Sequence, residues 1–187
     1  MADTEPQIAD AKVLWHFCMS LDGFVAGPNH EMDWMTGFWV RPGMHAEYIA
    51  TTGAVLAGRT GFDSAIGDAR PYGGEWDGPI FMLTHHPQDV RPGEGITVLR
   101  CPVEEALQIA LDAANGKNVE VFSPTIGRQL LERGLIDEID LHIAPILLGD
   151  GIRLYDNPAS VPVRLLRVGD GNPHAAVNVR YRPVTTR

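Results

Sequence analysis

Short apolar segments that alternate with helical segments are the feature that most constrains the fold of this chain. Lys12–Met19 and Ala54–Ala57 are apolar runs of strand length, and each leads into a turn that contains glycine. Such continuous runs are typical of strands buried on both faces of a parallel sheet. Ile80–Thr84 and Asn118–Phe122 predict two further strands. The alternation therefore predicts an α/β fold with a mostly parallel central sheet.

Helical signals occupy the intervals between these strands. Met44–Thr52 has the pattern of a short helix. Pro102 stands at the first position of a second helix, in which apolar residues recur at helical spacing from Val103 to Leu111. Ser123-Pro124-Thr125 is typical of the start of a third helix. The helices are expected to pack on the sheet.

The last part of the chain is dominated by strand signals. Asp137–Ala144 and Ile146–Leu148 predict another strand, broken by Pro145, and Val163–Val168 with Ala175–Tyr181 predicts an antiparallel hairpin. The segment from Ile139 to Leu148 is too apolar to remain exposed, so we expect it to be divided between the core and a two-fold interface. We expect an N-terminal tail, residues 1–11, and one domain, residues 12–187.

Charge and composition exclude several classes of function. The 187 residues include 15 Lys or Arg and 24 Asp or Glu, which gives a net charge of −9. Because such a chain repels phosphate backbones and anionic lipids, we expect neither nucleic acid nor a membrane surface as a partner. The first twelve residues lack the apolar core of an export signal, and no apolar run approaches the roughly 20 residues of a membrane span. With only Cys18 and Cys101, we expect a reducing cytoplasm.

Several common catalytic motifs are absent from the sequence. No GxGxxG follows the first predicted strand, and GxSxG, GxxxxGK[ST] and HExxH do not occur. This argues against a standard dinucleotide-binding domain, a serine hydrolase, a P-loop nucleotidase and a zinc protease. His85 and His86 are adjacent and would face opposite sides of a strand, so no metal site is expected.

Three predicted strand ends carry residues suited to an anion. They are Gly58-Arg59-Thr60, Thr84-His85-His86 and Ser123-Pro124-Thr125-Ile126-Gly127. Ligands of open α/β sheets collect at the carboxyl ends of strands, so the three segments together predict a site for a phosphorylated or anionic ligand. Taken singly, Ser123 and Thr125 are also consistent with helix caps, Arg59 with a solvated charge, and Asp22 with an ordinary turn residue.

Five ordered motifs resemble the dihydrofolate-reductase-like family. They are Met19-Ser20-Leu21-Asp22-Gly23-Phe24, Leu56-Ala57-Gly58-Arg59-Thr60-Gly61-Phe62, Tyr72-Gly73-Gly74-Glu75-Trp76, Thr84-His85, and the stretch from Gly134 to Gly151. Within the family, the chain is most similar to the reductase domain of the bifunctional riboflavin-biosynthesis deaminase-reductases and to its stand-alone relatives. The resemblance covers roughly residues 12–182.

The resemblance implies a three-layer α/β fold, a homodimer, and an NADPH-dependent reductase that transfers hydride to a C=N or C=O of a small, heterocyclic substrate. It also implies site residues. Asp22 would be catalytic and would lie in a loop over the nicotinamide. Phe24, Asp33 and Trp34 would bind the substrate. The cofactor would be held by Gly58, Arg59, Thr60, Thr84, His85, Ser123, Thr125, Ile126 and Gly127.

Three positions depart from the family pattern. Members usually have Gly-Gly where this chain has Ser123-Pro124, and proline has no N–H to offer a ligand. Because the family's bond is typically cis, the resemblance predicts a cis Ser123-Pro124 bond, whereas local sequence preference favours a trans bond with Pro124 at the first position of a helix. His86 stands where relatives often have arginine. Only Glu47 is a positional counterpart of the carboxylate that binds pterin, so a folate enzyme is not predicted. The alternative function is a non-catalytic ligand-binding or interaction protein of the same fold that has lost NADPH binding.

Overall fold

A computed structural model of the chain describes residues 5–37, 42–60, 71–90, 93, 95–158 and 161–169. Residues 7–155 form one unit, and residues 1–6 together with 156–187 form a second unit. The elements with bounds given below all lie in the first unit, and the described part of the second unit contains no helix or strand. The candidate site belongs to the first unit.

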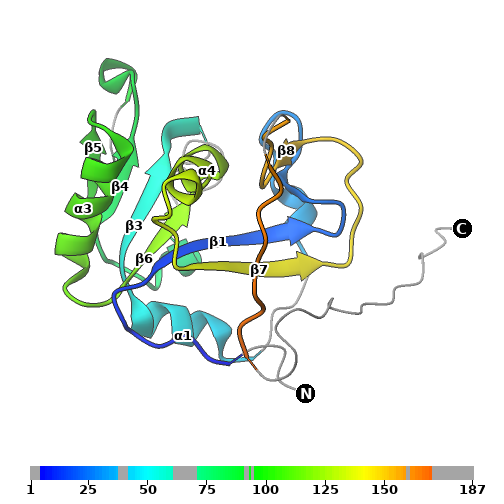
Figure 1. The fold of residues 1–187 in the computed structure, drawn as a ribbon, viewed down its shortest axis with the longest axis horizontal. Coiled ribbons are helices and arrows are strands. Elements are labelled where there is room, and N and C mark those ends of the chain that lie inside the picture. Colours follow the sequence, from blue (N-terminus) through cyan, green and yellow to red (C-terminus); the bar gives the residue numbers. More distant parts are fainter. Residues whose placement is uncertain are drawn as a thin grey trace, which may run out of the picture. The chain divides into compact units, whose positions relative to one another are not determined.

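Six strands form the central sheet of this unit, in the order β5-β4-β3-β6-β1-β7 (Figure 1). Every neighbouring pair in it is parallel. The strands are β1 (Val13–Ser20), β3 (Thr52–Gly58), β4 (Ile80–Leu83), β5 (Ile96–Leu99), β6 (Asn118–Phe122) and β7 (Glu138–Ala144). The carboxyl ends of all six strands therefore lie along one edge of the sheet.

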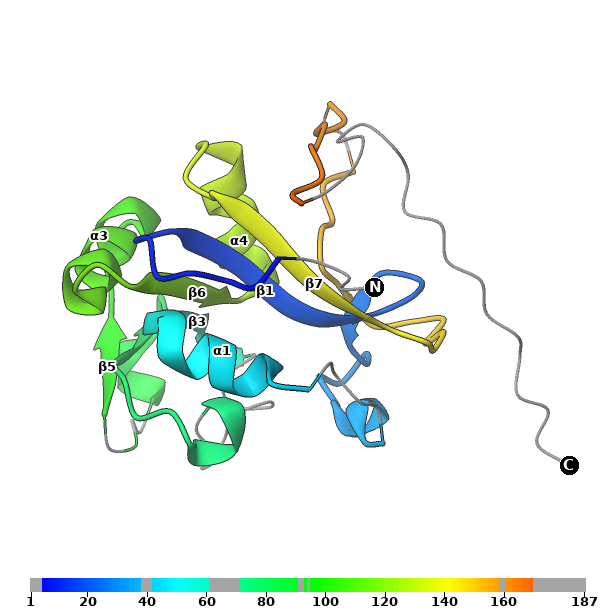
Figure 2. The same ribbon diagram turned by 90° about the horizontal axis from the view of Figure 1, so that it is seen from below.

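Helices cover both faces of the sheet and complete three layers. α3 (Val103–Ala114) and α4 (Pro124–Glu132) lie on one face, and α1 (Met44–Thr51) lies on the other (Figure 2). In α3 the buried residues recur at helical spacing along one side. Glu104 and Glu105 in its first turn interact favourably with the positive end of the helix dipole.

Alternate residues of the central strands supply two apolar clusters, one beneath each layer of helices. In β3, Ala54 and Leu56 pack in the larger cluster with residues of α3 and α4. Val55 and Ala57 pack in the smaller cluster with Trp76. Because both faces of this strand are buried, its sequence is apolar at every position from 54 to 57.

Smaller elements connect this framework. β2 (Phe24–Ala26) and β8 (Ile152–Arg153) pair antiparallel as a separate sheet. Gly151 precedes β8 with φ 144°, and a Cβ there would lie 2.2 Å from the carbonyl oxygen of Ala26, so glycine permits this close approach. The described residues of the unit also form three short 3-10 helices, η1 (Asp33–Met35), η2 (Pro71–Gly74) and η3 (Pro87–Asp89).

The architecture confirms the predicted three-layer α/β fold and its mostly parallel sheet. The predicted hairpin is wrong for its first arm, because Val163–Val168 contains no strand, while Ala175–Tyr181 lies outside the described residues. Apolar and β-branched residues show that a segment can pair, but pairing also needs a partner strand that the local pattern does not identify. Within the described ranges, no helix is both long and apolar enough to cross a membrane.

Candidate functional site

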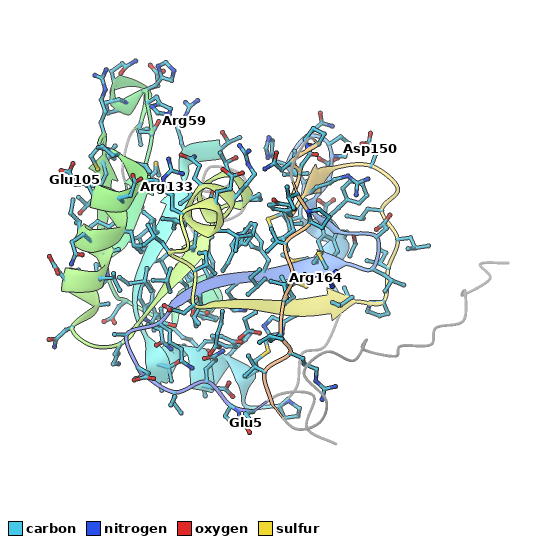
Figure 3. The ribbon with its side chains drawn as sticks, in the orientation of Figure 1. Glu5, Arg59, Glu105, Arg133, Asp150 and Arg164 are labelled. Atoms are coloured by element: carbon cyan, nitrogen blue, oxygen red, sulfur yellow. The ribbon has the colours of Figure 1, made fainter. Side chains whose placement is uncertain are left out.

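The sheet brings together the three strand ends that the sequence singled out. β3 lies between β4 and β6 and is parallel to both. Their carboxyl ends lead into Gly58-Arg59-Thr60, Thr84-His85 and Ser123–Gly127, so these segments meet at one edge. Arg59 lies at this edge, beyond the end of β3 (Figure 3).

Two hydroxyl groups at this edge are held by backbone amides. The Oγ atom of Ser123 accepts a hydrogen bond from the N–H of Ile126 at 3.3 Å, which makes Ser123 the N-cap of α4. Thr84 Oγ1 accepts from the N–H of His86 at 3.1 Å. Because a hydroxyl has one proton as well as two lone pairs, both side chains can still donate to a ligand.

The three strand-end segments are basic in a chain that is acidic as a whole. The segments 58–60, 84–86 and 123–128 contain Arg59, His85, His86 and Arg128 but no Asp or Glu. Arg128 also pairs with Glu132 at 3.4 Å, one turn along α4. An anion at this edge would therefore meet cationic and hydrogen-bond-donating groups and no carboxylate from these segments.

The start of α4 differs from the expectation in one respect. The described residues contain no cis peptide bond, so the prediction of a cis Ser123-Pro124 bond is wrong. Pro124 is the first residue of α4, where its fixed φ suits the helix, and Ser123 is extended, as is typical before proline.

Two predicted cofactor residues in α4 have structural contacts of their own. The side chain of Ile126 is 4% exposed and belongs to the core beneath α3 and α4. A Cβ at Gly127 would lie 2.1 Å from two ring atoms of Trp15 on β1. The absence of a side chain at Gly127 therefore allows α4 to pack closely on the sheet, which explains why this position is a glycine.

Asp22 lies in the turn between β1 and β2, and its carboxylate accepts three hydrogen bonds. The hydroxyl of Ser20 donates to it at 2.7 Å, and the amides of Leu148 and Gly149 donate at 3.1 and 2.8 Å. Desolvation raises the pKa of Asp22, but the bonds from Ser20, Gly149 and Leu148 outweigh it and lower the pKa to about 2. At neutral pH, Asp22 is therefore a carboxylate that ties this turn to the loop after β7.

The predicted substrate residues lie in elements that follow this turn. Phe24 is buried in β2, and the guanidinium carbon of Arg153 lies 4.5 Å above the centre of its ring. Asp33 and Trp34 belong to η1. The segment that contains η1, in light blue, lies on the same side of the sheet as α1 (Figure 2).

A polar cluster on the α1 side of the sheet contains none of the predicted site residues. We call it the α1-face cluster, and it consists of His16, Tyr48, Thr52, Tyr72, Glu120, Asp140 and His142. In the sequence, the cluster is indicated by polar residues at alternate positions of β7, namely Glu138, Asp140 and His142. Alternate residues of a strand share a face, so these three side chains are expected on one side of the sheet.

Glu120 is the centre of the α1-face cluster, and its side chain is 0% exposed. The hydroxyls of Thr52 and Tyr72 donate to its carboxylate, the latter at 2.5 Å. The Nδ1 atom of His16 lies 3.2 Å from Oε2 of Glu120, and its Nε2 atom lies 2.8 Å from Nε2 of His142. Glu120, His16 and His142 therefore form a continuous hydrogen-bonded chain across β6, β1 and β7.

Two tyrosines cover this chain. The ring of Tyr48 stacks on His16 with 4.3 Å between ring centres, and its hydroxyl donates to Asp140. Desolvation and the neighbouring Asp140 and Glu120 raise the pKa of Tyr48, and desolvation and Glu120 raise the pKa of Tyr72. Both phenols therefore remain protonated donors.

A hollow of about 300 Å³ lies elsewhere in the unit, against Thr52, Gly53 and Lys117. These residues mark the amino ends of β3 and β6, so the hollow lies at the opposite edge of the sheet from the three strand ends. Among the described residues, no group of three or more His, Cys, Asp or Glu side chains is arranged to hold a metal ion.

Comparison with solved structures shows the same fold in three proteins. A protein assigned to riboflavin biosynthesis from Shewanella sp. PV-4 has a TM-score of 0.65 at 21% identity, over 80% of this chain and 86% of that one. A diaminohydroxyphosphoribosylaminopyrimidine deaminase/5-amino-6-(5-phosphoribosylamino)uracil reductase from Thermotoga maritima has a TM-score of 0.60 at 16% identity. It aligns with 87% of this chain, which spans 54% of its length. Dihydrofolate reductase from Enterococcus faecalis, complexed with NADP(H) and RAB-propyl, has a TM-score of 0.57 at 16% identity, over 88% of this chain and 90% of that one.

The sequence comparisons match the chain to a protein family, while a search of curated proteins gives no match. Residues 74–171, more than half of the chain, match the RibD C-terminal domain family. The chain therefore belongs to the RibD C-terminal domain family.

Proposed function

We propose that this protein is an NADPH-dependent reductase that reduces a C=N or C=O of a small heterocyclic substrate. The observation that carries the proposal is the convergence of three strand ends, without a carboxylate among them, at the carboxyl edge of the sheet in a member of this family. The dihydrofolate reductase that shares the fold was solved with NADP(H), which supports a nicotinamide cofactor for this protein.

The residues at this edge fit a cofactor that carries phosphates. A Cβ at Gly58 would come within 2.9 Å of Ser123 Oγ, so glycine keeps the end of β3 clear of the α4 N-cap. Arg59 would pair with a phosphate, and the hydroxyls of Thr60, Thr84 and Ser123 would donate to it. A bound nicotinamide would supply a hydride there.

The remaining predicted residues have positioning roles in this proposal. Asp22 would fix the turn after β1 against the loop after β7, and this bridge would help to exclude water from the reacting atoms. Phe24, Asp33 and Trp34 would line the substrate side of the site.

Calorimetry with NADPH tests the proposal directly. We expect binding, and we expect Arg59→Ala to weaken it by about 1.5–3 kcal/mol if the guanidinium contacts phosphate. Arg133→Ala is the matched control, because Arg133 is the C-cap of α4, at the opposite end of that helix from Ser123, and bonds Glu104 at 2.5 Å. Absence of heat with millimolar NADPH and NADH would reject the proposed function.

A non-catalytic ligand-binding protein of the same fold is the second candidate. It is favoured by the start of α4, where Pro124 has no N–H and the N–H of Ile126 is engaged by Ser123. A protein that keeps its fold but binds neither NADPH nor NADH would support this alternative.

A homodimer and a cytoplasmic location belong to the same proposal. Ile143 and Leu147, in and after the edge strand β7, are 42% and 69% exposed, which suits a contact with a second copy. Cys18 and Cys101 are both free thiols, which suits a reducing compartment.

A further inference from the structure

Reduction of a C=N or C=O bond requires a proton as well as a hydride. The carbon atom accepts the hydride, with its two electrons, and the nitrogen or oxygen atom then takes a proton. Asp22 is poorly suited to give that proton, because its carboxylate already accepts three hydrogen bonds. The low pKa of Asp22 agrees with this geometry. A donor other than Asp22, either a water molecule or another side chain, is therefore needed if the proposed function holds.

We propose that His142 donates this proton, and that Glu120 and His16 position and polarise His142 for that step. The inference rests on the proposed function for the identity of the reaction. It rests on the α1-face cluster for the identity of the donor.

The hydrogen-bond pattern determines where the protons of the two imidazoles lie. Glu120 also accepts from Thr52 and Tyr72, so it is surrounded by donors, and His16 Nδ1–H donates to it as the third. The Nε2 atom of neutral His16 is then an acceptor. Because the two Nε2 atoms are 2.8 Å apart, one proton must lie between them, and His142 provides it. Proton gain and loss by His142 then occur at its Nδ1 atom.

Glu120 orients and polarises His16, as a carboxylate does when it orients an imidazole in a hydrolase, and its negative charge lies at the far end of the chain from His142. The other charged groups around the chain are mainly acidic. Asp140 accepts from Tyr48 and Gln7, and Glu138 accepts from Gln7 and pairs with Lys12 at 2.7 Å. On the α1 side, the carboxylate of Glu47 accepts a hydrogen bond from the backbone N–H of Gln7. On β1, the residue paired with His142 is Cys18, which carries a thiol.

Of the three residues, His142 lies farthest toward the carboxyl edge of the sheet, because the strand register places Glu120 beside Leu14 and His142 beside Cys18 of β1. It lies two residues before the end of β7, roughly 7 Å along the strand from that end. His142 is half-buried, whereas His16 is only 6% exposed and Glu120 is fully buried. A substrate that approaches from the carboxyl edge would therefore meet His142 first, and the other two act through it.

The proposed step balances as follows. The nicotinamide cofactor is oxidised and the substrate carbon gains the hydride. The N–H bond at Nδ1 of His142 breaks as a new bond forms between that proton and the substrate nitrogen or oxygen. His142 becomes neutral and recovers a proton from solvent.

Histidine NMR on the intact protein tests the relay without any substrate. We expect wild type to show the Nδ1–H tautomer of His16 and a proton shared between the two Nε2 atoms. Glu120→Gln, which removes the carboxylate charge, should move the His142 midpoint to lower pH. Tyr72→Phe, which keeps that charge and removes one competing donor to Glu120, should move the midpoint to higher pH and serves if Glu120→Gln does not fold. A His142 that titrates identically in wild type and in the folded variants would overturn the relay.

Turnover tests the catalytic part of the inference. With NADPH and 7,8-dihydropterin as the probe acceptor, we expect His142→Gln to lower kcat by roughly 10²–10⁴-fold, to abolish the fall in rate at high pH, and to leave NADPH affinity unchanged. An unchanged rate would overturn the assignment. If wild type fails to bind NADPH, the proposed function fails while the NMR titration still decides whether the relay exists. If NADPH binds but the probe is not reduced, the same titration decides whether the relay exists.

Discussion

Gly127→Ala is the substitution whose effect the structure determines most sharply. In an open helix interior, alanine is more favourable than glycine by about 0.8–1.0 kcal/mol. Here, however, the new Cβ would lie 2.1 Å from Cε2 and Nε1 of Trp15 and 2.5 Å from its Cδ1. Ordinary contacts with a Cβ are at 3.4–4 Å. Either α4 or the indole must therefore move by more than an ångström.

The expected outcome is a net loss of stability. Overpacking of a core costs about 1–3 kcal/mol, and this contact is at the severe end because Trp15 is 1% exposed. After subtraction of the helix-propensity gain, the net loss should be about 1–2 kcal/mol, or roughly 2–8 °C in Tm for a chain of this size. Urea denaturation followed by circular dichroism measures the difference in the free energy of unfolding.

A double-mutant cycle with Trp15→Phe isolates the contact. A phenyl ring is smaller on the side that faces Gly127, so the double variant should be more stable than the sum of the single effects predicts, by more than about 0.5 kcal/mol. Thr125→Ala, on the exposed side of α4, is the control for a change in the same helix. If Gly127→Ala stabilised the protein, or if the two effects were additive, the packing explanation for this glycine would be refuted.

Three further outcomes are expected. Asp22→Asn should destabilise the protein at neutral pH. Because the pKa of Asp22 is lower in the folded than in the unfolded protein, the loss in free energy of unfolding should shrink as pH falls from about 4 to about 2. Urea melts that give the same loss at pH 7 and pH 3 would contradict this. Ser123→Ala should cost about 0.5–2 kcal/mol in thermal melts through loss of the α4 N-cap, and Ser123→Asn should recover most of it. Light scattering at micromolar concentration should report a dimer, and a mass near 20.4 kDa, that of one chain, would contradict this prediction.

The sequence predicted the framework better than the polar interior. β4, β6 and α3 begin within a residue or so of their expected positions, because apolar periodicity and the turn residues between segments carry most of that information. Ser123 caps α4, as its sequence indicated, whereas Pro102 is the N-cap residue of α3 and not its first helical residue.

The site could be predicted only in part. The strand ends were identifiable because the carboxyl edge of a parallel sheet is a known location for ligands. His16 and Glu120 were not, because each lies within a predicted strand, and only the strand order places β6, β1 and β7 side by side. Two of the three hydrogen bonds of Asp22 likewise come from residues more than a hundred positions later in the chain.

The position of β1 in the strand order affects how the chain is made. β1 is the first strand to be synthesised, yet its partners are β6 and β7, which begin at Asn118 and Glu138. At synthesis rates of about 5–20 residues per second, β1 waits on the order of ten seconds before either partner exists. Throughout that interval an apolar segment with unpaired backbone groups is accessible to other chains, so we expect nascent chains of this protein to depend on chaperones until β7 has left the ribosome.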